Sequence, residues 1–198
     1  MEKLPTTPSQ TIGPFFAYSL TAEQYGYNFN SLVNDKLVSE KTAGERICIT
    51  GKVFDGEGNT IHDAMIELWQ ADANGKYITQ YPNIPVSQYL NIPFKGFGRL
   101  GTGTTEDHSF IFQTIKPGSI DGQAPHINVI LFMRGSLHRL TTRLYFNDEV
   151  NDNDPLLNSI EPARRATLIA NKKVIGNEVQ YEFNIFMQGE NETVFFKL

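Results

Sequence analysis

The chain has 198 residues, which is long enough for one domain with a hydrophobic core of its own. A net charge of −5 without any run of basic residues argues against binding to nucleic acid or to an anionic membrane. Cys48 is the only cysteine, so neither an internal disulfide nor a thiolate metal site can form. No stretch reaches the ~18 apolar residues of a membrane span, and the first residues have no apolar core of a signal peptide. We therefore expect a cytoplasmic protein.

Residues 1–45 have no regular period and form an extended N-terminal arm in this interpretation. The arm carries Phe15, Phe16 and Tyr18, and aromatic side chains of this size need cover from water. We expect the arm to lie on a partner chain, with packing on its own domain as the alternative.

The rest of the chain alternates between short strands and turns. Period-2 patterns predict strands at residues 47–53, 64–70, 109–114, 126–133, 141–146, 179–187 and 193–197. Residues 80–104 are rich in Pro and Gly and predict a long loop. A helix is predicted at residues 161–170, with Ser159 as its cap. Many short strands with one short helix and long loops indicate a single all-β domain over residues 1–198, a β-sandwich.

The most specific pattern lies in residues 49–77. It reads Ile49-x-Gly51-x-Val53, then Gly58, Ile61, Ile66-Glu67-Leu68 and Gly75-x-Tyr77. This pattern resembles the signature of the intradiol ring-cleaving dioxygenases, and the resemblance continues through residues 96–101, 114–118, 124–127 and 188–196. It implies the prealbumin-like β-sandwich of that family. It also implies a chemistry in which ferric iron and O₂ open a catechol ring between its two hydroxylated carbons.

Catalytic chains of this family hold Fe³⁺ with two tyrosines and two histidines. Phenolates suit this hard ion, and a His-x-His pair on a strand presents both rings on one face. Tyr77 matches the first tyrosine and His126 the first histidine. Ile120 and Asn128 fall at the second tyrosine and the second histidine, and Gln123 stands at or near the place of an arginine that precedes the histidines. The resemblance therefore implies a lapsed iron site, with neither a metal nor a catalytic residue in this chain.

That pattern of losses is similar to the α chains of the protocatechuate-cleaving members. The similarity implies a partner β chain that carries Fe³⁺, further αβ assembly, and protocatechuate and O₂ as substrates of the complex. Gly13, Pro14 and Arg134 match positions that α chains contribute to the rim of the β-chain pocket. Arg134 has the parity of His126 but lies eight residues on, about 26 Å along a strand, so it would serve a neighbour's site or pair across an interface.

Plainer interpretations remain beside these. Tyr77 can be a packed tyrosine at a strand end, and His126 a hydrogen-bonded core histidine. A stand-alone dioxygenase with a rebuilt metal site is a second hypothesis, and Asp121 is the acidic residue near enough to His126 to supply a ligand. A non-catalytic β-sandwich binding module is a third. Glu67 stands among apolar residues and must be paired if it is buried.

Overall fold

The computed structural model describes residues 12–197 except residues 14, 30, 32 and 79–91. The strands are β1 (Arg46–Phe54), β2 (Met65–Trp69), β3 (Phe97–Gly101), β4 (Ser109–Ile115), β5 (His126–Phe132), β6 (Leu140–Phe146), β7 (Ile169–Ile175), β8 (Glu178–Glu182) and β9 (Ile185–Phe186). The helices are α1 (Phe15–Leu20), α3 (Pro155–Asn158) and α4 (Pro162–Arg165), with 3₁₀ turns η1 (Ala22–Tyr25) and η3 (Ala166–Leu168). Among these residues no helix has the length and apolar character needed to cross a bilayer.

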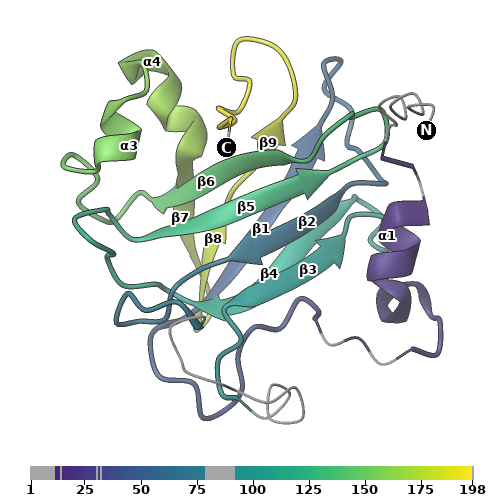
Figure 1. The fold of residues 1–198 in the computed structure, drawn as a ribbon, viewed down its shortest axis with the longest axis horizontal. Coiled ribbons are helices and arrows are strands. Elements are labelled where there is room, and N and C mark those ends of the chain that lie inside the picture. Colours follow the sequence, from purple (N-terminus) through teal and green to yellow (C-terminus); the bar gives the residue numbers. More distant parts are fainter. Residues whose placement is uncertain (1–11, 14, 30, 32, 79–91, 198) are drawn as a thin grey trace, which may run out of the picture.

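The strands form one hydrogen-bonded path that folds into two layers. Its order is β3-β2-β5-β6-β7-β8-β1-β4, and β9 pairs with β1. The β3-β2-β5-β6 half is antiparallel, whereas β7 joins β6 in parallel and β8 joins β1 in parallel. In Figure 1, β6, β5, β2 and β3 lie in front of β1, β8 and β4. The predicted β-sandwich is confirmed.

The core lies between the two layers. Ile49 and Phe112 reach it from the rear layer, and Leu68, Val129 and Leu144 reach it from the front layer. These side chains are at most 1% exposed, as the period-2 alternation of their strands predicts. Because Ile127, Val129 and Leu131 of β5 face the core, the alternate residues of that strand face outward. The candidate site lies on this outer face.

The described part of the N-terminal segment lies along the open edge of the sandwich. Residues 34–38 bond to both edge strands or their flanks: the Leu37 amide donates to Gln113 O, and the Arg99 amide donates to Asn34 O. The Gln24 side chain also pairs with both backbone groups of Gly101. Covering edge strands in this way removes unpaired backbone groups that would otherwise recruit another chain.

The segment predicted as one helix at residues 161–170 is three shorter elements. α4 ends at Arg165 and η3 ends at Leu168, and Ile169 already begins β7 by pairing with Tyr145 of β6. Ser159 does not cap α4, because its hydroxyl donates back to Leu156 O at the end of α3. Strand pairing has overridden a weak local helix preference.

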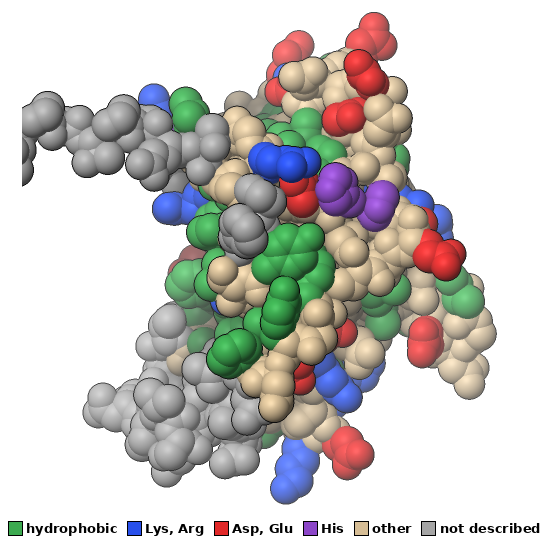
Figure 2. All heavy atoms as spheres, turned by 90° about the vertical axis from the view of Figure 1, so that its right-hand side faces the viewer, with side chains coloured by type: hydrophobic (Ala, Val, Ile, Leu, Met, Phe, Trp, Pro, Cys, Tyr) green, Lys and Arg blue, Asp and Glu red, His purple; other side chains and the backbone are tan. Residues whose placement is uncertain are grey.

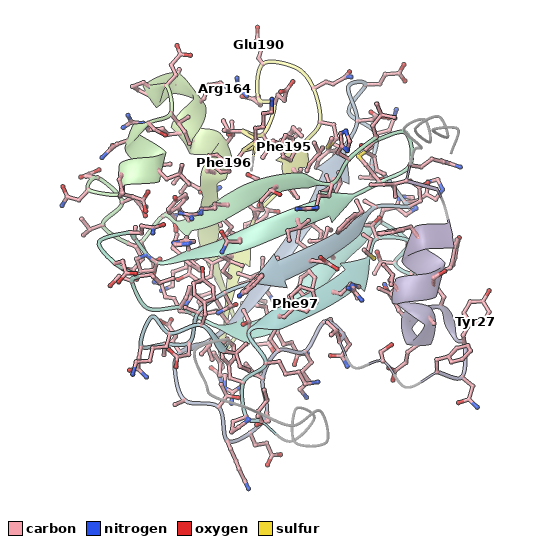
Figure 3. The ribbon with its side chains drawn as sticks, in the orientation of Figure 1. Tyr27, Phe97, Arg164, Glu190, Phe195 and Phe196 are labelled. Carbon is pink, nitrogen blue, oxygen red and sulfur yellow. The ribbon has the colours of Figure 1, made fainter. Side chains whose placement is uncertain are left out.

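Other boundaries also differ from prediction. β3 lies inside the predicted loop, α1 lies inside the predicted irregular arm, and residues 179–187 form two strands, β8 and β9. The tail at 193–197 makes only an isolated bridge, in which the Phe196 amide donates to Thr141 O at 2.7 Å. Figure 3 shows Phe195 and Phe196 of this tail beside Arg164, whose Nη2 donates to Glu192 O at 2.9 Å.

Candidate functional site

Three of the four predicted lapsed-site positions come together on the outer face of the front layer. His126 and Asn128 are alternate residues of β5, and Tyr77 follows the turn after β2. Asn128 Nδ2 donates to the Tyr77 hydroxyl at 3.0 Å and to Trp69 O at 3.2 Å. The Trp69 and Tyr77 rings meet edge to face, with centroids 5.9 Å apart. Tyr77, Asn128 and Trp69 are therefore in contact with one another, and His126 lies on the same face of β5 as Asn128.

An arginine that the sequence pattern did not indicate completes the cluster. Arg143 of β6 lies directly opposite Asn128 in the β5-β6 ladder. Its Nε donates to Asn128 Oδ1 at 3.1 Å, and its Nη1 donates to Gln123 Oε1 at 2.6 Å and to the Tyr145 hydroxyl at 3.4 Å. The amide of Asn128 therefore joins the Tyr77 phenol on one side to a guanidinium on the other.

A buried carboxylate anchors the far side of this network. Asp154 is 1% exposed, and its Oδ1 accepts from the Tyr145 hydroxyl at 3.1 Å and from the Leu157 amide at 2.8 Å. Its Oδ2 accepts from the Ala124 amide at 2.9 Å. Burial, the largest cause, raises the pKa of Tyr145 to about 12, so this hydroxyl remains a donor at neutral pH. The Asp154 carboxylate therefore fixes the start of β5 and the N-terminus of α3 at once.

His126 is fully buried and has the protonation pattern of a ligating imidazole. Its Nδ1 lies 2.8 Å from Ala124 O, and because a carbonyl can only accept, Nδ1 carries the proton. In the neutral ring Nε2 is then the acceptor, and it is buried without a hydrogen-bond partner in the described part of the chain. Burial lowers the pKa of His126, opposed by its bond to Ala124. The imidazole is thus held neutral.

The fourth position, Ile120, lies in a tight turn rather than in the cluster's hydrogen-bond network. Ile120 and Gln123 exchange both backbone hydrogen bonds, at 3.2 and 2.8 Å. Asp121 and Gly122 between them have φ values of 46° and 79°, as a two-residue hairpin turn requires. The turn holds Gln123 where Arg143 reaches it, and Asp121 is exposed at its tip.

The predicted rim residues meet at another edge of the molecule. Arg134 follows β5, and its Nε lies 3.0 Å from Asp63 Oδ2, with 56% of the side chain exposed. The Ile12 amide donates to Ser136 O at 2.9 Å, which places exposed Gly13 next to the turn that carries Arg134. Pro14 lies outside the described residues. Two segments far apart in sequence thus share this edge.

Glu67 has the partner that its burial requires. Arg99 of the neighbouring strand β3 lies opposite it in the ladder. Arg99 Nε and Nη2 approach Glu67 Oε1 at 2.7 and 2.6 Å. Strand β3 was hidden in the predicted loop, so this pairing could not be predicted from the sequence.

A family profile described as "Dioxygenase" matches residues 20–189. The chain belongs to the intradiol ring-cleaving dioxygenase family. It is 45% identical to the protocatechuate 3,4-dioxygenase alpha chain of Burkholderia cepacia, over 99% of both chains. It is 32% identical to the beta chain from the same organism, over 87% of this chain and 77% of that one. Among solved structures, the dioxygenase domain of a carbohydrate-binding fusion protein from Streptomyces sp. SirexAA-E matches with a TM-score of 0.60 at 24% identity, over 96% of this chain and all of that one.

The residues present do not fit the ferric ion that intradiol dioxygenases use. Fe³⁺ needs anionic oxygen ligands, and Tyr77 is the one phenol among the four predicted positions, with its oxygen already accepting a hydrogen bond from the amide of Asn128. Ile120 has no donor atom, and Asn128 is tied to a guanidinium. Of the four predicted ligand positions, His126 alone has a ligand atom, Nε2, without a hydrogen-bond partner among the described residues.

Proposed function

We propose that this chain is the α subunit of a heteromeric protocatechuate 3,4-dioxygenase and holds no iron itself. Its relatives of that name span essentially its whole length, and a β chain is a more distant homologue. In this proposal a partner β chain binds Fe³⁺, and the αβ units assemble further. The complex, a cytoplasmic catabolic enzyme, uses O₂ to cleave protocatechuate between its two hydroxylated carbons, giving 3-carboxy-cis,cis-muconate.

The observation that carries the proposal is the state of the ligand positions. Asn128 stands where a second histidine would be needed, and both ends of its amide are engaged, by Tyr77 and by Arg143. A carboxamide in this arrangement cannot replace an imidazole or a phenolate around Fe³⁺. Chemistry that depends on iron must then come from a second chain.

This chain's contribution to catalysis would lie at the rim. Iron in the β chain would bind the catechol and supply the redox chemistry with O₂, while Gly13, Pro14 and Arg134 would border that pocket. Arg134 pairs with Asp63 through Nε, and more than half of its side chain is exposed. Its two Nη groups would be free to grip the carboxylate of an aromatic acid, which is the geometry that guanidinium and carboxylate share.

A surface suited to a partner chain lies beside this rim. Figure 2 faces the side of the molecule that carries α1 and shows hydrophobic side chains gathered there. Tyr18, Tyr27 and Phe29 are 40%, 57% and 69% exposed, and Figure 3 shows Tyr27 pointing away from the body of the domain. Exposed aromatic residues of this kind are typical of the centre of a protein interface.

Co-expression tests the proposal. The chain is purified alone and with a β chain from the same gene cluster, and protocatechuate-dependent O₂ uptake is measured in both preparations. We expect uptake and 3-carboxy-cis,cis-muconate from the pair and none from the lone chain. Protocatechuate-dependent O₂ uptake by the lone chain would overturn the proposal and would favour the alternative, a stand-alone dioxygenase with a rebuilt metal site.

A further inference from the structure

The lapsed ligand positions are arranged around a guanidinium. Arg143 contacts Asn128 through Nε and Gln123 and Tyr145 through Nη1. Its hydrogen-bonding partners are all oxygens of uncharged side chains, and within the described residues Arg143 has no carboxylate within ion-pair distance. The Asp154 carboxylate reaches this guanidinium only through the Tyr145 hydroxyl, so Arg143 is the partly buried cation of this polar cluster.

The strand register makes this contact unavoidable. Asn128 and Arg143 are directly opposed in an antiparallel pair, so their Cβ atoms lie about 4.5–5.5 Å apart and their side chains meet on the same face. Whatever residue stands at position 128 therefore lies beside this guanidinium. A histidine there would face a fixed positive charge, which disfavours a metal cation at the same point.

We propose that Arg143 closes the lapsed metal position. Its guanidinium is the cation that the remaining polar groups face, and it excludes metal ions even when the missing histidine is restored. This inference rests on the proposed function, because it takes Tyr77, His126 and Asn128 as former ligand positions. It goes further in naming the residue that prevents metal binding, whereas loss of ligands alone would make Arg143 incidental.

His126 makes the inference testable, because one ligand atom is still in place. Its Nδ1 is occupied by Ala124 O, while its Nε2 is buried and has no hydrogen-bond partner in the part of the chain that the structure describes. With Asn128→His the chain would regain a His-x-His pair on the outer face of β5, next to Tyr77. Two imidazoles and a phenol are a sufficient donor set for Co²⁺, whose absorption in the visible range reports its coordination.

The experiment compares Co²⁺ binding to full-length chains by equilibrium dialysis and visible absorption. The variants are N128H, N128H with R143M, and N128H with R139M. Arg139 is exposed and lies just before β6, and no hydrogen bond or ion pair joins it to the cluster among the described residues, so R139M removes the same charge without opening the position. A further variant, N128H with R143Q, keeps a hydrogen-bond donor for Gln123 or Tyr145 in case the methionine variant does not fold, and thermal melting checks each protein.

We expect N128H with R143M to bind about one Co²⁺ per chain and at least about tenfold more tightly than N128H or N128H with R139M. Equal binding by N128H and the R143M double variant would overturn the inference, because Arg143 would then exclude nothing. Absence of binding by folded R143M and R143Q double variants would also overturn it. Iron in the unmodified chain, measured in the same preparations, would instead contradict the proposed function, so the two failures are distinguishable.

Discussion

Replacing Arg143 by methionine should destabilise the chain by about 2–3 kcal/mol. Arg143 donates hydrogen bonds of 3.1 Å to Asn128 and 2.6 Å to Gln123, while its 3.4 Å contact with Tyr145 is too long to contribute much. A hydrogen bond from a charged donor contributes about 1.5–3 kcal/mol. Because the side chain is only partly buried, each of the two good bonds is counted at or below the low end of that range. Methionine keeps most of the aliphatic packing and removes both bonds.

Urea unfolding followed by circular dichroism measures this loss, with R139M as the matched control. A loss of 2–3 kcal/mol corresponds to a fall in Tm of roughly 4–12 °C for a domain of this size. R139M should stay within about 0.5 kcal/mol of the unmodified chain, since Arg139 is exposed and outside the cluster. If R143M and R139M unfold at the same urea concentration, the guanidinium is not held as described and the reasoning fails.

Three further results are expected. Burial holds the pKa of His126 below its usual 6.5, so the contribution of this histidine to the free energy of unfolding should be complete above about pH 6.5 and be lost as the pH falls from there through the lowered pKa. H126Q should flatten this decline in urea unfolding at a series of pH values, and an unchanged decline in H126Q would refute the assignment. Glu67→Ala should lower the free energy of unfolding by about 3–5 kcal/mol, because it leaves the Arg99 guanidinium, which is 22% exposed, without its carboxylate. The pairing would be refuted if a double variant that also carries Arg99→Met were no more stable than Glu67→Ala alone. In the αβ complex, Arg134→Ala should raise KM for protocatechuate about tenfold with a smaller change in kcat, and an unchanged KM in steady-state O₂ uptake would remove Arg134 from the substrate site.

Strand periodicity predicted the sandwich, and the family resemblance together with the parity of β5 indicated the residues of the cluster. The inward residues of β1 and β5 follow the period-2 pattern, and the same parity puts His126 and Asn128 together on the outer face. The family motif that ends at Tyr77 added that residue to the site, and the structure places it beside Asn128 because β2 and β5 are neighbours in the sheet. The alternation within a single strand was therefore sufficient to predict which face of the strand each residue occupies.

Arg143 could not be predicted in the same way, because its role depends on strand register. The sequence does not state that position 143 lies opposite position 128, and the hairpin between β5 and β6 is long enough to allow other alignments. One signal was available: Arg143 has the outward parity of a strand whose alternate residues, such as Leu144, are apolar. A charged residue on the outer face of a strand has many ordinary explanations, so that signal alone could not assign it to the site.

The prediction of a single helix at residues 161–170 was wrong because the end of the helical segment also depends on strand pairing. Pro162 in the first turn correctly indicated where α4 begins, although the predicted cap, Ser159, does not cap it. The helical segment ends at Leu168 because the next two residues, Ile169 and Ala170, pair with Tyr145 and Phe146 of the distant strand β6. The C-terminal end of this helical segment is decided by pairing with a distant strand, which the neighbouring residues in the sequence cannot indicate.

The most direct test of the central claim is the metal content of the purified αβ complex and of its separated chains. Inductively coupled plasma mass spectrometry on the complex, quantified by amino-acid analysis, should find at most one iron per αβ pair, all of it following the β chain when the two are separated. Iron that stays with this chain, or two irons per pair, would contradict the account, because the positions of Tyr77 and Asn128 would then hold a metal that their hydrogen bonds argue against.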